Sequence, residues 1–523
     1  MKQDNERRIS SPWRVFLLSW LLLSLIAVIW SIATPISAAP DEPSHIIKAA
    51  SVARGEIRGA NTPDGQQVEV PAYIAFADNQ TCFAYNPQIT AECAPLEYGD
   101  TGKIVTTTTS AGLYNPTYYF LVGWPSLLFH TNAGVYAMRA VSGMLSSLFL
   151  ALAFMMVSGW KRPLFPLLGL LVAATPMVFF LDGVINPSSV ETTATLAAFI
   201  GVVGIVLHPA RSLVTQRSII VLASAAIAVN MRGISPLWVA IALAAPFILS
   251  SRDQMSVLLR LQSIRIAAIG ILLFTAASVV WTLLSNSLGT GLSTGVGAAP
   301  VAGVGYSPIH GFGQILIATF DYGEGLVGIF GWLDTPVPSS VYFAWSLFVG
   351  GLLLAGLSVL RSWRLVFVVV LTSALVFLPA VVQGIYVKSG GIVWQGRYAL
   401  PIFVCVVFGV AAVLADRIPT IDTVSAKPFT SLVIAIWLGA QMFAFVIALK
   451  RYAVGTAPVG GASWRGLFLR PAWSPPLVGT IGVTFAFCVV CAGIALMAWL
   501  LAMRSRQPCA ARHRSSPFGR LQP

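Results

Sequence analysis

Residues 13–33 read WRVFLLSWLLLSLIAVIWSIA, an apolar run whose single charged residue, Arg14, lies near its start. An α-helix needs about 20 apolar residues to cross roughly 30 Å of hydrocarbon, so this run predicts a transmembrane helix. The basic segment before it and the small residues after it also suit a signal peptide. However, the run is longer than a signal-peptide core of about 7–15 residues, and we expect it to remain as the first span.

Similar apolar runs recur along almost the whole chain of 523 residues. The chain is 56% hydrophobic and 10% charged, against roughly a quarter charged in soluble proteins, and its mean hydropathy is +0.80. This composition excludes a soluble globular protein and predicts an all-α polytopic membrane protein with about twelve transmembrane helices. The segment 217–231 is the weakest of these predicted spans because it is short. The spans after the first are expected near 133–158, 163–181, 187–208, 217–231, 235–250, 264–284, 341–360, 365–387, 398–415, 429–449 and 477–502.

The spans divide the chain into alternating membrane and loop regions. We expect a cytoplasmic N-terminus (1–12), the first transmembrane helix (13–33), a first external loop with interfacial helices (34–132), transmembrane helices 2–7 (133–284), a second external loop with an interfacial helix (285–340), transmembrane helices 8–12 (341–502) and a basic cytoplasmic tail (503–523).

The charges set the predicted orientation. The formal net charge is +13, and with a cytoplasmic N-terminus the inner side carries 20 Lys and Arg against 5 Asp and Glu, and the outer side 12 against 14. Cytoplasmic loops are enriched in basic residues, so both termini are expected in the cytoplasm and both long loops outside. The basic residues are spread over short loops and form no stripe, which argues against a nucleic-acid partner.

Two cysteines lie in the predicted first external loop, Cys82 and Cys93. An oxidising compartment permits disulfides. We therefore predict a bridge between them.

A cluster of ionisable residues follows the first span, in the sequence PDEPSHIIK at residues 40–48. Pro43 suits the first turn of a helix, whose N-terminus favours the ionised forms of Asp41 and Glu42. Such a carboxylate can act as a general base toward a hydroxyl or ligate a divalent cation. It can equally serve only to cap the helix. The sequence requires no cofactor and leaves a divalent cation open, with Asp41, Glu42 and His45 as its ligands if one takes part.

Five short motifs resemble those of the bacterial membrane family numbered 2142 among domains of unknown function. They are PDEPSH at 40–45, NPTYY at 115–119, NPS at 186–188, GWLD at 331–334 and QGRYALP at 395–401. That family is grouped with the GT-C superfamily, whose members transfer sugars from polyprenyl-phosphate donors at the outer face of the membrane. The resemblance implies a GT-C-like bundle in a bacterial plasma membrane, with its active site facing outside.

The resemblance also implies roles for single residues. In GT-C enzymes an acidic residue just after the first helix is essential, and Asp41 matches that place, with Glu42 beside it. Its carboxylate positions or deprotonates the acceptor hydroxyl, which attacks the anomeric carbon as the lipid phosphate leaves. Arg397 is best placed to hold this phosphate, since its planar donors suit phosphate oxygens, although it can also be an interfacial anchor. Further candidates for phosphate binding are Lys388, Arg232 and Lys48.

Other motif residues are candidates for substrate binding. Trp332 beside Asp334 suits a sugar, because an indole stacks on the ring while a carboxylate accepts hydrogen bonds from hydroxyls. A tryptophan at the membrane interface and an aspartate in a turn explain the pair equally well. Tyr118 likewise suits an interfacial aromatic, and Asn186 a turn residue. The remaining candidates are His45, Asn115, Gln395 and Tyr398.

We therefore predict a membrane glycosyltransferase that moves a hexose or pentose from a polyprenyl-phosphate-linked donor to an envelope glycan or lipid acceptor. The alternatives are a transporter or flippase of lipid-linked glycans and a non-catalytic scaffold with the same fold. A transporter is expected to place ionisable residues near the middle of its spans. The charges furthest inside the predicted spans, Arg139 and Glu191, lie less than two turns from the external ends.

Overall fold

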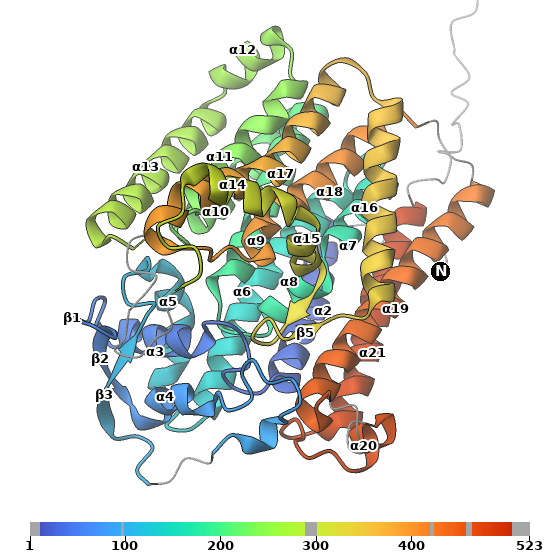
Figure 1. The fold of residues 1–523 in the computed structure, drawn as a ribbon. Helices are drawn as coiled ribbons and strands as arrows, with labels where there is room; N and C mark the ends of the chain where they lie inside the picture. The colour runs from blue at the N-terminus through green and yellow to red at the C-terminus, as the bar shows by residue number, and fades with distance from the viewer. Residues whose placement is uncertain (1–10, 96–98, 288–300, 419–422, 457–462, 505–523) are drawn as a thin grey trace, which may run out of the picture.

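Figure 1 shows a computed structural model of the chain, which describes residues 11–95, 99–287, 301–418, 423–456 and 463–504. Most of the predicted N-terminal segment (1–12), nearly all of the basic tail (503–523) and part of the predicted second external loop (285–340) lie outside the described residues.

Among the described residues, nine helices are long and apolar enough to cross a membrane. Apolar residues around the whole helix surface allow burial in a bundle or contact with lipid. α9 and α18 are almost wholly buried, whereas most residues of α13, α16 and α17 are exposed or only partly buried. The nine helices are α2 (Pro12–Ala33), α6 (Ala133–Ser158), α9 (Pro187–Leu207), α13 (Gln262–Ser285), α16 (Ser339–Val359), α17 (Ser362–Gly390), α18 (Leu400–Ala415), α19 (Thr423–Val454) and α21 (Gly479–Arg504).

The other three predicted spans also contain helices, but these are broken or short. α7 (Leu164–Ala173) and α8 (Pro176–Asp182) meet at a bend of 61° and count as a tenth span only if taken together. α10 (Arg211–Ala228) and α11 (Ser235–Ala244), which continues into the 3₁₀ helix η4 (Ala245–Leu249), are shorter apolar helices, whereas α18 reaches the length of a span together with η5 (Gly396–Ala399). Pro176 and Pro246 interrupt regular α-helix in two of the three segments, since proline lacks the N–H that continues the hydrogen-bond ladder.

The region between α2 and α6 folds into short elements at one end of the bundle, the same end as α20, while α12 lies at the other end (Figure 1). β1, β2 and β3 form an antiparallel sheet in that order, with Val68 of β2 opposite Thr107 of β3. Alternate residues of β2 are buried, as expected for a strand with one covered face. The elements are α3 (Glu42–Ala53), β1 (Ala60–Thr62), β2 (Gly65–Pro71), α4 (Ala72–Ala75), η1 (Phe76–Gln80), η2 (Ala91–Cys93), β3 (Ile104–Thr109), α5 (Pro116–Gly123) and η3 (Trp124–Leu127).

The remaining short elements connect the later helices. The glycine of the QGRY motif is required by packing, because a Cβ on Gly396 would clash with the carbonyl of Tyr322. This contact seats η5 directly against α15. The elements are α12 (Arg252–Arg260), α14 (Pro308–Ile317), α15 (Thr319–Val327), the antiparallel pair β4 (Ile329–Phe330) and β5 (Thr335–Pro336), η5 (Gly396–Ala399) and α20 (Trp464–Leu469).

Candidate functional site

The centre of the candidate site is an ion pair between Asp41 and Arg397, which are 356 positions apart in the chain. Asp41 precedes α3 in the left-handed conformation, with φ of 66°, which turns the chain between α2 and α3. Arg397 lies in η5, just before α18. Its Nη2 donates to Oδ2 of Asp41 at 2.6 Å. The acidic motif and the late basic motif therefore meet in the fold.

The two partners differ sharply in exposure. The Asp41 side chain is 52% exposed, whereas that of Arg397 is 1% exposed. Nε and Nη1 of Arg397 are buried and have no hydrogen-bond partner among the described residues. A buried donor without a partner is costly, and guanidinium nitrogens bind phosphate or carboxylate oxygens strongly. Two nitrogens of Arg397 are thus available to an anion while the third holds Asp41.

Asp41 and His45 differ in charge state. Burial alone would raise the pKa of the Asp41 carboxyl, but the charges of Arg397 and Arg232 outweigh it and lower the pKa below its ordinary value. Burial lowers the pKa of His45 to about 3. Its Nδ1 lies 2.8 Å from the hydroxyl of Tyr119. At neutral pH the site therefore holds an ionised carboxylate and an uncharged imidazole.

A second arginine approaches from the turn between α10 and α11. Nη1 of Arg232 donates to the Ser188 hydroxyl at 2.9 Å, and its guanidinium carbon lies 4.1 Å from the ring centre of Tyr398. The guanidinium carbon of Arg397 lies 5.4 Å from the same ring centre. Both guanidinium groups therefore lie against the ring of Tyr398, close to Asp41.

Asn186 connects this arginine to the Asp41 turn. Its side chain caps α9 by accepting a hydrogen bond from Ser188 N–H at 3.0 Å, and its amide reaches the Pro40 carbonyl at 3.5 Å. Asn115 caps α5 and donates to the Asn230 side chain at 2.9 Å, just before Arg232. Asn186 thus bonds to the turn that carries Asp41, and Asn115 bonds to the turn that carries Arg232.

Glu42 is separate from the site, although it follows Asp41 directly. Its carboxylate accepts hydrogen bonds from Nε and Nη2 of Arg139, both at 2.7 Å, and from Ile185 N–H at 3.1 Å. Both side chains are fully buried. Arg139 also donates to the carbonyl of Ser31 in the last turn of α2 and to those of Thr34 and Pro35 just after it. The geometry does not support the predicted catalytic role of Glu42; its carboxylate anchors the turn that presents Asp41.

Four other predicted residues lie apart from the ion pair. Lys48 is buried and donates to the carbonyls of Ile57 and Gly112, while Lys388 is exposed at the end of α17. The Tyr118 hydroxyl bonds to Ser142 at 2.8 Å. Asp334 is paired with Arg451 at 2.8 Å. The polar groups of Lys48, Tyr118 and Asp334 are thus bonded to backbone carbonyls, a serine and Arg451, respectively. Lys388 is exposed.

Two further candidates lie close to the site. Oε1 of Gln395 is buried without a hydrogen-bond partner among the described residues. Trp332 donates from Nε1 to the carbonyl of Ser37 at 2.9 Å, in the turn that leads to Asp41.

A disulfide joins Cys82 and Cys93, with 6.1 Å between their Cα atoms.

The three residues named as ligands for a divalent cation do not converge. Asp41 faces Arg397, Glu42 faces Arg139 and His45 faces Tyr119. No group of three or more His, Cys, Asp or Glu that could hold a metal ion occurs within the described part of the chain. The positive charge beside Asp41 comes from the two arginines.

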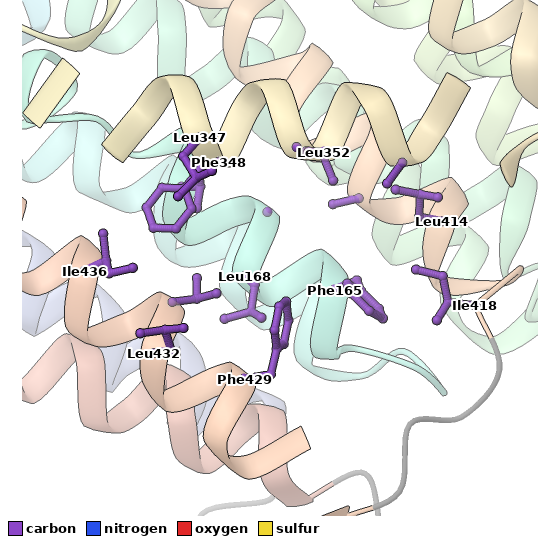
Figure 2. A pocket seen from close by; sticks show the side chains of 16 residues that line it. Phe165, Leu168, Leu347, Phe348, Leu352, Leu414, Ile418, Phe429, Leu432 and Ile436 are labelled. Carbon is purple, nitrogen blue, oxygen red and sulfur yellow. The ribbon is translucent and has the colours of Figure 1, made fainter. Parts of the chain in front are cut away.

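An apolar cavity of about 460 Å³ lies beside Arg397. Trp394, Gly396 and Ala399, which surround Arg397 in sequence, form one wall, and residues of α15, α16, α17 and α18 form the others. A second apolar cavity, of about 400 Å³, is lined by Leu414, Ile418 and side chains of α7, α16 and α19 (Figure 2). It lies at the opposite end of α18 from Arg397, so only the first cavity adjoins the charged site.

Several residues of the site escape prediction from the sequence. Arg139 carries a usable signal, because a charge within a span is expensive and implies a partner. Tyr119 and Ser188 occur inside the quoted motifs, and only the fold shows that they contact His45 and Arg232. Tyr114 packs 5.9 Å from the His45 ring and has no distinguishing sequence pattern.

Comparisons with known proteins give a structural likeness and a family. The fold is similar to the crystal structure of ArnT from Cupriavidus metallidurans bound to undecaprenyl phosphate, with 14% identity, coverage of 93% of this chain and 76% of that chain, and a TM-score of 0.43. No curated protein matches the sequence. Residues 23–406 match the family described as predicted membrane protein (DUF2142). The chain therefore belongs to the DUF2142 family of membrane proteins.

Proposed function

We propose that this protein is a glycosyltransferase that moves a sugar from a polyprenyl-phosphate donor to a glycan or lipid of the cell envelope. The observation that carries the proposal is the buried guanidinium of Arg397, which binds Asp41 through one nitrogen and has two nitrogens without a hydrogen-bond partner in the part of the chain that the structure describes. An anion-binding group and an ionised carboxylate in contact are what this reaction needs. Arg397 would bind the phosphate and Asp41 the acceptor hydroxyl.

The reaction then proceeds by a single displacement. The acceptor oxygen bonds to the anomeric carbon while the bond from that carbon to the phosphate oxygen breaks, and the electron pair leaves with the polyprenyl phosphate. The hydroxyl proton passes to Asp41 and afterwards to water. The charge that develops on the phosphate is stabilised by Arg397, with Arg232 as the second cation against Tyr398.

Donor binding would also make Asp41 a better base. In the free protein Arg397 lowers the pKa of Asp41. A phosphate on Arg397 would neutralise that charge, so the effect of burial, which raises the pKa, would dominate. The carboxylate would therefore gain basicity when the donor is in place.

The apolar cavity beside Arg397 supports a lipid-linked donor over a soluble nucleotide sugar. Its lining includes Gly396 and Ala399, which flank Arg397 in the chain, and side chains of α16 and α17, two helices in which few residues are fully buried. A phosphate on Arg397 would therefore leave its lipid chain beside apolar side chains that continue toward the lipid-facing helices. Glu191 and Arg139 lie within the first two turns of α9 and α6, away from the middle of the spans where a transporter would need them.

The protein is a multi-pass membrane protein. From the distribution of Lys and Arg we propose that both termini lie in the cytoplasm and that Asp41 faces the outside of the plasma membrane. The polyprenyl-phosphate donor and the envelope acceptor would then meet at the outer face.

The envelope glycans of a deletion strain test this proposal. We expect wild-type protein to restore the missing sugar and Asp41→Asn to restore none at equal amounts in the membrane. Asp64→Asn, at an exposed carboxylate of the same region, serves as the matched control and should restore it fully. Full restoration by Asp41→Asn would contradict catalysis by Asp41 and favour a non-catalytic scaffold.

A further inference from the structure

Two aromatic rings lie beside the Asp41 turn, those of Tyr85 and Trp332. Their centres are 5.4 Å apart, with the planes tilted by 58°. Trp332 is hydrogen-bonded to the Ser37 carbonyl. Tyr85 lies near enough to Asp41 and Arg397 for their charges to act on the pKa of its hydroxyl. The rings come from the segment after η1 and from the turn between β4 and β5, so the fold brings them together at the edge of the site.

The pair is held on a rigid base by Arg451 at the end of α19. Its Nη1 donates to the Ile89 carbonyl and its Nη2 to the Phe83 carbonyl, both at 2.7 Å. Nη2 also binds Asp334, two residues after Trp332, at 2.8 Å. The guanidinium is 1% exposed, and the Cys82–Cys93 disulfide closes the same segment. One buried cation thus fixes the segment that carries Tyr85 to the turn that carries Trp332.

Tyr85 itself is 69% exposed and has a φ of 60°. Positive φ is strained for a tyrosine, and strain that a fold retains is a reason to look for function. The exposed residues that follow it are the polar Asn86 and Gln88 and the apolar Ile89. The ring is thus exposed on a segment that lies outside the candidate spanning helices.

We infer that Tyr85 and Trp332 form the acceptor subsite and that the acceptor is a saccharide, stacked by the C–H face of a sugar ring on these side chains with a hydroxyl directed to Asp41. The inference rests on the proposed function. Neither ring lines the apolar cavity beside Arg397, so the two substrates would approach Asp41 over different surfaces. Stacking on the face of an aromatic ring, with hydroxyls left in water, suits a sugar ring and not a lipid chain.

Equilibrium binding without donor tests the inference. The probes are fragments of purified envelope polysaccharide, titrated onto full-length protein in nanodiscs. We expect binding to wild-type protein and about tenfold weaker binding to Tyr85→Ala and to Trp332→Ala, as for the loss of a well-packed aromatic contact. Tyr85→Phe, which keeps the ring, should bind like wild type. So should Trp464→Ala, which removes an exposed tryptophan on α20.

The outcomes separate this inference from the proposed function. No binding by wild-type protein, or unchanged binding by both alanine variants, would overturn the saccharide subsite. Asp41→Asn should transfer no sugar, and because both rings remain it should still bind the fragments, more tightly than Tyr85→Ala or Trp332→Ala. Normal transfer by Asp41→Asn would instead overturn the proposed function and leave the binding result standing.

Discussion

Asp41 has a lowered pKa because of the guanidinium of Arg397, against the effect of burial. The wild-type carboxylate is therefore ionised at neutral and mildly acidic pH, and kcat/KM for transfer should show no loss from this group between pH 5 and 8. In Arg397→Gln burial is no longer opposed by this charge, so the pKa of Asp41 rises and activity is lost at the acidic end of that range. Arg470→Gln, at an exposed arginine, is the control. If Arg397→Gln keeps its kcat/KM at the acidic end of that range, the electrostatic coupling between Arg397 and Asp41 is contradicted.

Arg397 should also determine donor affinity. Lysine at this position keeps the charge but loses the planar array of donors, so we expect Arg397→Lys to raise the donor KM by about tenfold or more. The measurement is the donor concentration dependence of transfer by purified protein. A donor KM equal to that of wild type would show that the phosphate binds elsewhere.

Glu42 and Asp41 should respond differently to loss of charge. Glu42→Gln leaves the buried Arg139 without its counter-ion, which typically costs about 3–5 kcal/mol, so we expect a strongly lowered Tm in detergent. Asp41→Asn changes a half-exposed side chain and should leave Tm close to that of wild type. The double variant Glu42→Gln, Arg139→Gln should recover part of the loss. Equal Tm values for wild type and Glu42→Gln would contradict the anchoring role.

At the scale of elements, the segment after η1 depends on its covalent closure. The cysteines are 11 residues apart, and closing a loop of that size stabilises a fold by about 3 kcal/mol in the chain-entropy model. We expect Cys82→Ser to lower Tm and to weaken saccharide binding several-fold, with the donor KM unchanged, since the segment that carries Tyr85 then loses its covalent closure and keeps only non-covalent contacts such as those of Arg451. Cys488→Ser, in α21, is the control. Unchanged saccharide binding by Cys82→Ser would separate the disulfide from the subsite.

The apolar runs made the helices predictable, whereas their lengths depend on local breaks. Pro176 bends the third predicted span and Pro246 turns the end of α11 into 3₁₀ helix. The sheet β1–β3 escaped prediction because its strands are short. Asp41 and Arg397 stand out in the sequence by their motifs, but sequence alone does not show that they touch. It also does not distinguish Asp41 from Glu42, because only the packed position of Arg139 decides which of the two carboxylates is buried.

At the scale of the whole molecule, orientation in the membrane remains a prediction from charge. A cysteine introduced at Asp64 should react with a membrane-impermeant maleimide in intact cells, above the level of wild-type protein. A cysteine at Arg260, in α12, should react only after the membrane is opened. Both residues are exposed. Strands β1 and β2, which Asp64 connects, and helix α12 lie at opposite ends of the bundle (Figure 1). The reverse labelling pattern would place Asp41 in the cytoplasm.

The most direct test of sugar transfer by the Asp41–Arg397 pair is an assay with purified protein. It would use radiolabelled polyprenyl-phosphate hexose or pentose as donor and envelope polysaccharide fragments as acceptor. We predict that wild-type protein labels the acceptor, and that Asp41→Asn binds the donor at least as tightly as wild type, because a negative charge beside Arg397 is removed, yet transfers no label. Label transferred by Asp41→Asn at the wild-type rate would contradict the account.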